Sequence, residues 1–382
     1  MNFLWYLFIV SCIYQIVYQL VLVFAIIKNQ KTNSDNYRNA NFTILKSVSV
    51  IICAKNEAEN LQKNLPFILE QNYANFEIII VDDGSDILLT MNDERLAIIN
   101  LTNAEKIGLG KKYALQKGIE AAKNELILLT DADCQPLSKN WIREMAGCVN
   151  DKHKIVLGIS PYKTENTILN SLIEYETAQT ALQYVGFALL KNPYMSVGRN
   201  VLYDAALLKS KIWTTQELSI ASGDDDLTIQ TLATKENTTV CLSKDSYTVS
   251  KAKDSWSAWI QQKLRHYESG SMYRFSHRLF LGSYLFKKMI LYSVLLFFIC
   301  NGFKIFFTIP SASSFFLKCC FYAPCFFMLF CICFTFFINY ILNKKLQLNK
   351  RWYFAVFNDL LYCIFTIMLG LISQFKTTKN WK

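Results

Sequence analysis

Two carboxylates spaced two residues apart, Asp131 and Asp133, have the clearest chemical use in this sequence. They follow the apolar run 125–130, which predicts a short buried strand that ends at the acids. In open α/β folds, ligands bind at the carboxyl ends of the strands. Two hard oxygen donors on one turn suit a Mg²⁺ or Mn²⁺ ion that keeps water ligands and bridges to phosphates. An acidic turn that serves only solubility is the alternative interpretation.

Two further acids, Glu57 and Asp83, follow other predicted strands. Glu57 comes after the strand 48–53 at the start of a helix, where the helix dipole favours a carboxylate. Contact with a nucleotide ribose or base edge is the functional alternative for Glu57. Asp83 follows the strand 77–81, and a carboxylate there can accept the imino N–H of a uracil ring. Both acids are therefore candidates for nucleotide binding.

A lysine and a run of acids each stand at the start of a predicted helix. Lys111, in the run Gly-Leu-Gly-Lys-Lys at 108–112, lacks the spacing of a P-loop but can neutralise a diphosphate at the helix start. Three consecutive acids, Asp224–Asp226, begin another helix. Helix capping explains one of them, and a carboxylate that faces a sugar hydroxyl could act as a general base.

Gln262 and Arg265 lie three residues apart on the predicted amphipathic helix 255–273. This spacing puts both side chains on one face, where they could hold an acceptor or a leaving diphosphate. A basic helix that lies against lipid headgroups is the alternative interpretation.

The elements that must position these residues alternate between short β runs and helical stretches. Strands are expected at 48–53, 77–81, 97–101, 125–130, 154–159 and 199–203. Helices are expected at 57–69, 113–122, 169–190, 225–234 and 255–273. This alternation predicts an α/β fold with a mostly parallel sheet. The apolar helix 169–190 is expected to pack inside the protein or to lie on the membrane.

The two ends of the chain resemble membrane segments. The sequence has 382 residues, 52% of them hydrophobic, and no charged residue before Lys28. Segments long enough to cross a bilayer are predicted at 3–27, 289–309, 319–342 and 353–373. The expected organisation is a transmembrane anchor, a polar linker, a cytoplasmic domain and a membrane region with about three spans, at residues 1–28, 29–46, 47–280 and 281–382. Asp359, inside the last span, is a candidate site by its position alone.

The net charge and the cysteine spacing indicate which partners and which cellular location to expect. The net charge of +10 fits a protein beside an anionic membrane, and no RNA-binding signature is present, so no nucleic-acid partner is expected. Lysines after the first span and between the last two place the domain in the cytoplasm, and a bacterial inner membrane is the expected location. With four spans, the lysine-bearing tail 376–382 would lie outside the cytoplasm, which conflicts with the preference of lysines for the cytoplasmic side. The alternative is that one segment lies flat on the membrane or re-enters it. The 12 cysteines lack zinc-ligand spacing and indicate free thiols.

The motifs at the strand ends and helix starts, which contain the candidate residues, occur in one order between Val48 and His266. With the motifs in that order, this stretch resembles the family 2 glycosyltransferases. These are inverting enzymes with a GT-A fold that use nucleotide-diphosphate sugars. Membrane-embedded members include ceramide glucosyltransferases and the cellulose, chitin and hyaluronan synthases. The resemblance implies a GT-A domain, a nucleotide-diphosphate sugar donor such as a UDP-sugar, a Mg²⁺ or Mn²⁺ cofactor, and a lipid or glycan acceptor.

The resemblance also implies a role for the acids and the lysine. Glu57, Asp83 and Lys111 would bind the nucleotide. Asp131 would contact the ribose or the diphosphate, and Asp133 would bind the metal.

The residues implied for the base and the acceptor lie later in the chain. Asp225 matches the second acid of the family's Glu-Asp pair, the expected general base, and Asp224 replaces the usual Glu. Arg199 falls where family members contact the acceptor. Gln262 and Arg265 match the pattern Gln-x-x-Arg-Trp, whose last position is His266 in this sequence and not Trp.

Three other functions remain as alternatives or are excluded. A processive polysaccharide synthase is the enzyme alternative, although the missing Trp and only three C-terminal spans argue against it. A non-catalytic membrane scaffold is the alternative from another class. A dinucleotide-binding enzyme is excluded because no Gly-x-Gly-x-x-Gly follows the first strand.

Overall fold

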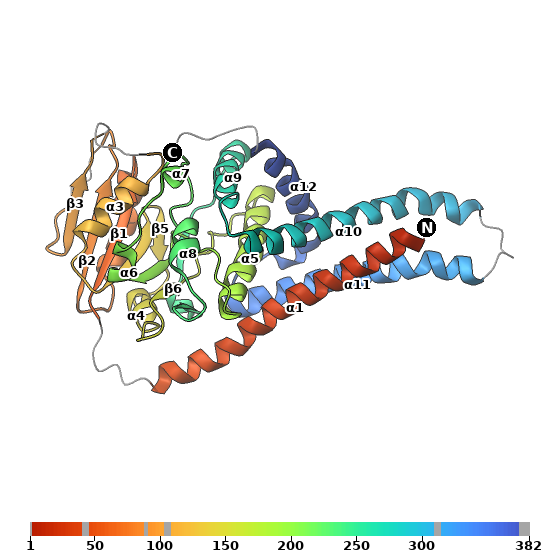
Figure 1. Cartoon of the computed structure of the whole chain (residues 1–382), viewed down its shortest axis with the longest axis horizontal. Helices are drawn as coiled ribbons and strands as arrows, with labels where there is room; N and C mark the ends of the chain where they lie inside the picture. Colours follow the sequence, from red (N-terminus) through yellow and green to blue (C-terminus); the bar gives the residue numbers. More distant parts are fainter. Residues whose placement is uncertain (1, 40–45, 88–90, 103–107, 309–314, 374–382) are drawn as a thin grey trace.

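A sheet domain and a set of long helices make up the fold (Figure 1). The computed structural model describes residues 2–39, 46–87, 91–102, 108–308 and 315–373. The helices α1 (Asn2–Asn39), α10 (Phe275–Thr308) and α11 (Phe315–Leu346) pack side by side and run away from the sheet (Figure 1). The helix α12 (Ala355–Ser373) lies instead against the body of the protein, next to α5 and α9 (Figure 1).

The main sheet has seven strands in the order β3-β2-β1-β4-β7-β6-β8. Their bounds are Val48–Ala54, Phe76–Asp82, Leu96–Asn100, Leu126–Asp131, Ile155–Leu157, Val201–Asp204 and Thr238–Val240 for β1, β2, β3, β4, β6, β7 and β8. The strands β1 to β4 are mutually parallel, and β7 runs antiparallel to both β4 and β6. The predicted mostly parallel sheet is therefore confirmed. A second, antiparallel pair joins β5 (Cys134–Pro136) to β9 (Thr248–Ser250).

The helices of this domain cover both faces of the sheet. They are α2 (Ala58–Leu69), α3 (Lys112–Ala121), α4 (Trp141–Ala146), α5 (Ile168–Leu189), α6 (Ala205–Lys209), α7 (Thr215–Leu218), α8 (Asp226–Leu232) and α9 (Trp256–Gly270). Each predicted helix of this domain agrees with one of these within a few residues. The short elements α4, α6, α7, β5, β8 and β9 were not predicted.

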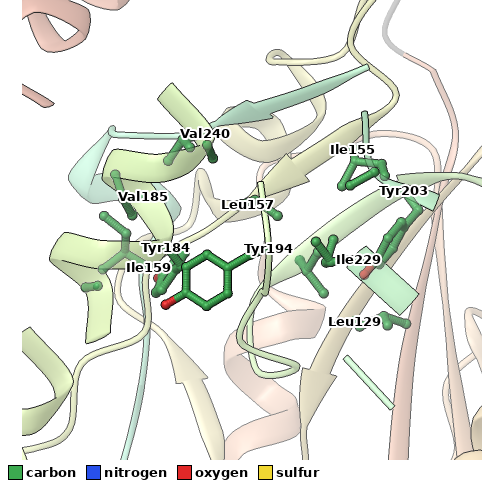
Figure 2. Packing of buried hydrophobic residues seen from close by; sticks show 14 of the residues in the cluster. Leu129, Ile155, Leu157, Ile159, Tyr184, Val185, Tyr194, Tyr203, Ile229 and Val240 are labelled. Atoms are coloured by element: carbon green, nitrogen blue, oxygen red, sulfur yellow. The ribbon is translucent and has the colours of Figure 1, made fainter. Parts of the chain in front are cut away.

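The sequence of β4 is apolar at consecutive positions because both faces of the strand are buried. Leu126 and Leu128 point into a core cluster shared with α2 and α4, whereas Ile127 and Leu129 point into the cluster shared with α3 and α5. A strand buried on both faces reads as a continuous apolar run. Figure 2 shows part of the second cluster, in which Leu129 lies among side chains from several strands, α5 and α8.

Helix α5 is buried on nearly all sides, which confirms the expectation that it packs inside the protein. Thr167 caps its start, because the side-chain oxygen accepts a hydrogen bond from Asn170 N. One side of α5 contacts the sheet cluster (Figure 2), and other sides contact α1, α11 and α12. At Gly186 an added Cβ would lie 2.8 Å from Leu22 Cδ2 of α1, so the two helices approach closely there.

Among the described residues, three helical segments are long and apolar enough to cross a membrane, namely Tyr6–Gln30, Leu329–Leu346 and Trp352–Ser373. These segments support an association with a membrane. Helix α1 continues to Asn39, so the first part of the predicted linker 29–46 is helical. The predicted span 289–309 falls on α10 except for Ile309, which lies outside the described residues, as does the tail 376–382.

Two buried ion pairs hold the C-terminal part of the chain, one with α5 and one between α10 and α12. Arg351 Nε lies 3.1 Å from Glu174 Oε2 of α5. Asp359 pairs with Lys288 of α10 and also accepts hydrogen bonds from Tyr175 and Tyr292. The position of Asp359 is thus explained by partners that join α5, α10 and α12. The α11–α12 connection lies on the same side of the helices as the sheet domain.

Candidate active site

A cavity of about 1110 Å³ opens at the carboxyl ends of β1 and β4. It gathers nine of the ten predicted site residues from six parts of the chain: Glu57, Lys111, Asp131, Asp133, Arg199, Asp224, Asp225, Gln262 and Arg265. Asp83 is the exception. It is 1% exposed and does not line the cavity, and its N–H donates to Ala54 O at 2.7 Å, which continues the pairing of β1 and β2 by one residue. Its contact with a nucleotide base stays a prediction.

The parallel pairing of β1 and β4 places Asp131 at the sheet edge, opposite Cys53. Asp131 Oδ1 accepts a hydrogen bond from Lys111 Nζ at 2.9 Å. Burial opposes ionisation of Asp131, but Lys111 outweighs it and holds the pKa of this carboxyl below its ordinary value, with help from Arg199 and Arg265. Asp131 is therefore an anion held by cations.

The pKa of Asp133 is shifted in the opposite direction to that of Asp131. Burial, and then the neighbouring charge of Asp131, raise the pKa of Asp133, and the attraction of Arg199 only partly offsets them. A cation placed beside the two carboxylates would relieve this repulsion.

The donor set at the sheet edge fits a divalent metal that a diphosphate helps to bind. Among residues 2–39, 46–87, 91–102, 108–308 and 315–373, no group of three or more His, Cys, Asp or Glu side chains is arranged to hold a metal ion. Mg²⁺ is commonly bound by one or two carboxylates together with substrate phosphates, and Asp131 and Asp133 provide those two.

Lys111 links the two acidic parts of the cavity. Its Nζ lies 2.9 Å from Asp131 Oδ1 and 3.1 Å from Asp224 Oδ2, so one ammonium group joins the end of β4 to the acids before α8. Its neighbour Lys112 is buried and donates from Nζ to Ile220 O at 2.7 Å and to Ser222 O at 2.5 Å. The two lysines therefore fix the acidic segment against the start of α3.

Glycines allow this docking. Gly108 and Gly110 have φ of +82° and +76°, a conformation that disfavours other residues. Leu109 N donates to Leu218 O at 2.8 Å, and a Cβ on Gly110 would lie only 2.2 Å from Ala221 O. The backbone around residue 110 is thus in direct contact with the chain that leads to Asp224.

Replacing Gly110 by Ala is expected to destabilise the fold by about 2 kcal/mol or more, because left-handed strain and a backbone clash add together. The midpoint of urea unfolding of the purified membrane protein measures this. Gly282→Ala is the control, since an added Cβ in α10 meets nothing within 4 Å. Equal midpoints for the two variants would contradict the assignment of the clash.

Asp225 is anchored by backbone N–H groups from two segments. Its Oδ2 accepts from Gly198 N at 2.7 Å, and its Oδ1 accepts from Asp226 N at 2.9 Å, which caps α8. Burial, and then the charge of Asp224, raise the pKa of Asp225 to about 6, against the opposing effects of Lys111 and the two N–H groups. A fixed carboxylate with such a pKa can accept a proton near neutral pH.

Arg199 follows Gly198, whose N–H donates to Asp225. Its guanidinium donates to Ser250 Oγ at 3.0 Å and to Ser160 O at 3.1 Å, and it stacks over the Tyr162 ring at 4.1 Å. These contacts fix its position, and its charge acts on both Asp131 and Asp133. Arg199 thus contributes positive charge to the cavity from a rigid support.

Helix α9 contributes Gln262, Arg265 and His266 to the cavity wall. Enclosure, and then the nearby cations Lys263 and Arg265, hold the pKa of His266 well below its ordinary value, so the imidazole is neutral. The position that carries Trp in the family pattern therefore presents a smaller, uncharged hydrogen-bonding group.

A further part of the cavity wall was not predicted from the sequence. It is rich in tyrosine and leucine side chains from α10, α12 and the segments before α10, namely Tyr194, Tyr273, Leu281, Tyr284, Leu285 and Tyr362. Nothing in the local sequence distinguishes these residues from ordinary core or lipid-facing ones. The cavity therefore extends from the acids at the sheet edge to the helices α10 and α12.

Comparison with known proteins agrees with the predicted resemblance. Residues 49–208 match the family described as Glycosyl transferase family 2. An uncharacterised glycosyltransferase of Haemophilus influenzae is 27% identical over 155 residues, which are 39% of this chain and 44% of that protein. A poly-β-1,6-N-acetyl-D-glucosamine synthase of Staphylococcus epidermidis is 29% identical over 138 residues, which are 35% of this chain and 32% of that protein. The chain spans less than half the length of these two relatives.

A solved structure shares the fold along most of the chain. A mannosyltransferase from Pyrobaculum calidifontis, solved in complex with GDP-Man and Mn²⁺, has a TM-score of 0.53, covering 94% of this chain and 98% of that chain. At 15% sequence identity the likeness concerns the fold alone. Asp225 and α9 lie beyond the matched family segment, and the fold brings them to its acids. Residues 49–208 are therefore similar to glycosyl transferase family 2, and the domain that contains them has the GT-A fold.

Proposed function

We propose that the protein is an inverting glycosyltransferase that moves a sugar from a nucleotide-diphosphate donor, expected to be a UDP-sugar, to a lipid or glycan acceptor. The observation that carries the proposal is the shared cavity. It contains a cation-bound carboxylate at Asp131, a repelled one at Asp133 and an anchored one at Asp225 with a pKa of about 6. Donor binding, charge neutralisation and proton removal each have a residue of the required type.

The reaction follows as a single displacement. Asp225 accepts the proton of the acceptor hydroxyl, whose oxygen attacks C1 of the sugar on the face opposite the nucleotide. The bond from C1 to the diphosphate breaks, and Lys111 and Arg265 offset the charge that develops on the leaving group. Arg199, Asp224 and Gln262 are expected to contact the acceptor or the diphosphate. An α-linked donor gives a β-glycoside.

A Mg²⁺ or Mn²⁺ ion at Asp133, assisted by Asp131, would act as a Lewis acid on the diphosphate. Glu57 and Asp83 are assigned to the nucleotide. The position of Glu57 supports its assignment to the nucleotide, because the residue lines the cavity at the start of α2. Its carboxylate accepts a hydrogen bond from Asn60 Nδ2 at 2.5 Å. The mannosyltransferase of similar fold was solved with Mn²⁺, which is consistent with a divalent ion in this chain.

The cavity supports an acceptor with a lipid portion. Its acidic end would receive the reacting hydroxyl, and its tyrosine-rich end, beside α10 and α12, would receive an apolar portion. We place the protein in a bacterial inner membrane with residues 47–280 in the cytoplasm. Lys344 and Lys345 in the last turn of α11, and Lys350 between α11 and α12, support this orientation.

Release of UDP or GDP from a panel of nucleotide sugars tests the proposal. The full-length protein, reconstituted with Mn²⁺ and a lipid extract, is expected to release nucleotide from one donor and to modify a lipid or a glycan. Mass spectrometry of the mixture would identify the acceptor. Failure to bind any nucleotide sugar in the presence of Mn²⁺ would contradict the proposal and favour a non-catalytic scaffold.

The transfer rate should depend on pH through Asp225. Because this carboxyl is the base, it acts only when ionised, so kcat/KM should be level above about pH 6 and fall about tenfold for each pH unit below that value. The wild-type profile between about pH 5 and pH 8 measures this. A profile that stays level down to pH 5 would contradict the assignment of Asp225.

A processive polysaccharide synthase is the second candidate, and the similarity to the poly-β-1,6-N-acetyl-D-glucosamine synthase favours it. His266, in place of the Trp that lines the acceptor site of such enzymes, argues against it. Product length decides between the two, because a ladder of oligomers requires processive transfer whereas a single added sugar does not.

A further inference from the structure

Helix α8 carries the proposed base at its start but is only two turns long. Asp225 caps its N-terminus, and the helix runs from Asp226 to Leu232. Helices this short are not stable by themselves, so tertiary contacts must hold them. The contacts that hold α8 therefore determine where the Asp225 carboxylate lies.

The first contact comes from the residue next to the base. One carboxylate oxygen of Asp226, Oδ2, accepts hydrogen bonds from Tyr273 OH at 2.5 Å and from Ser269 Oγ at 3.2 Å. Ser269 belongs to the last turn of α9, and Tyr273 lies just before α10. Burial, and then the charge of Asp225, raise the pKa of Asp226, while the two hydroxyl groups oppose the rise. The hydroxyls thus hold an acid that the site would otherwise repel.

The second contact is one helical turn further along α8. Gln230 lies four residues after Asp226, on the same face of the helix. Its amide lies 3.0 Å from His277 Nδ1 and donates to Tyr194 O at 2.8 Å. Its backbone carbonyl accepts from Arg274 Nη2 at 2.6 Å. Both Gln230 and His277 are buried, at 8% and 4% exposure.

Both contacts reach one segment of the chain, residues 269–277, which we name the α9–α10 junction. It is the place where the helix that carries Gln262 and Arg265 leads into the long helix α10 (Figure 1). Elsewhere along α8, the apolar residues Leu227 and Ile229 are buried in the protein. The polar face of α8 is therefore matched to the junction at both of its turns.

We propose that Asp226 and Tyr273 are positioning residues that fasten the base helix to the α9–α10 junction, so that the placement of the long helix α10 sets the position of the base. The inference rests on the proposed function, because it concerns the base of that reaction. Neither side chain removes the proton or binds the donor. Asp226 acts through Asp225, and Tyr273 acts through Asp226.

Removal of one hydroxyl group tests this arrangement. Tyr273→Phe in the full-length protein should lower kcat roughly 10-fold to 100-fold, since a misplacement of about 1 Å can cost that much. The affinity for the donor with Mn²⁺, measured by calorimetry, should change less than about twofold, because Lys111, Asp131 and Asp133 do not touch Tyr273. A fall in kcat at constant donor affinity is not expected from general destabilisation.

The matched control is Tyr73→Phe. Tyr73 OH also donates one hydrogen bond of 2.5 Å, to Lys46 O, on the face of the sheet covered by α2 and α4. Any stability lost with a buried tyrosine hydroxyl should therefore appear in both variants, as an equal change in melting temperature. Only Tyr273→Phe should lose kcat.

A double-mutant cycle separates positioning from direct contact with the acceptor. If Tyr273 acts through Asp226, the variant Asp226→Ala/Tyr273→Phe should have about the same kcat as Asp226→Ala alone. Effects that multiply in the double variant would overturn the proposal, and so would wild-type kcat in Tyr273→Phe. A wild-type protein that transfers no sugar, or an Asp225→Asn variant that remains fully active, would instead refute the proposed function itself.

Discussion

Replacing Asp225 by Asn is expected to reduce sugar transfer by about 10²-fold to 10⁴-fold, the usual contribution of a general base. The amide has the same shape, and its oxygen can still accept the hydrogen bond from Gly198 N, so the cavity should keep its form. It cannot accept a proton from the acceptor hydroxyl. Donor affinity should stay close to the wild-type value, because donor binding is assigned to the other end of the cavity.

Nucleotide release in the presence of acceptor, together with calorimetry of donor binding, measures both parts of this result. Asp204→Asn is a suitable control. Asp204 caps α6 by accepting from Leu207 N at 3.1 Å, and it lies outside the cavity. The control should keep full activity, which would separate loss of the base from loss of a helix cap. Full transfer by Asp225→Asn would show that another group removes the proton.

Replacing Asp133 by Ala is expected to lower kcat/KM by at least about 100-fold, because loss of even an outer partner of a metal site costs 10-fold to 100-fold. Burial and repulsion from Asp131 make Asp133 an unfavourable anion unless a cation is present. Without Asp133 the metal would keep only Asp131 among the protein carboxylates of that turn. The apparent affinity for Mn²⁺ in the presence of nucleotide should therefore fall together with activity.

Electron paramagnetic resonance of Mn²⁺ reports metal binding without any need for turnover. Glu70→Ala is the control, since Glu70 forms an exposed pair with Lys139 at 3.0 Å and should change neither reading. Unchanged Mn²⁺ binding in Asp133→Ala would move the metal to other ligands. Activity that needs no divalent ion would remove the metal from the mechanism.

The helices and strands with a clear hydrophobic pattern were predicted from the sequence. Strands β1, β2 and β4 are apolar because helices cover both faces. Strands β2 and β4 end in acids, and Glu57 follows the end of β1. The three-residue strands β5, β8 and β9 contain no apolar run, so no sequence pattern predicted them. Strand β6 is equally short but entirely apolar, and it was predicted.

The contacts of the site were less predictable than its residues. Lys111 was identified by its place before a helix, but its bridge between Asp131 and Asp224 depends on how Gly110 packs against residue 221. Asp83 was identified by the same strand-end rule as Asp131, yet it is buried and does not line the cavity. Such outcomes depend on tertiary contacts between distant segments, which a local pattern does not contain.

Helix α5 has a consequence for how this protein holds together as a folding unit. The same helix completes the apolar core of the sheet domain and packs against α1, α11 and α12. A fragment limited to residues 47–280 would expose the side of α5 that Leu22 and the C-terminal helices cover, and would be prone to aggregate. Sheet and membrane helices should therefore melt in a single cooperative transition, and detergents that loosen the helices should also loosen the catalytic cavity.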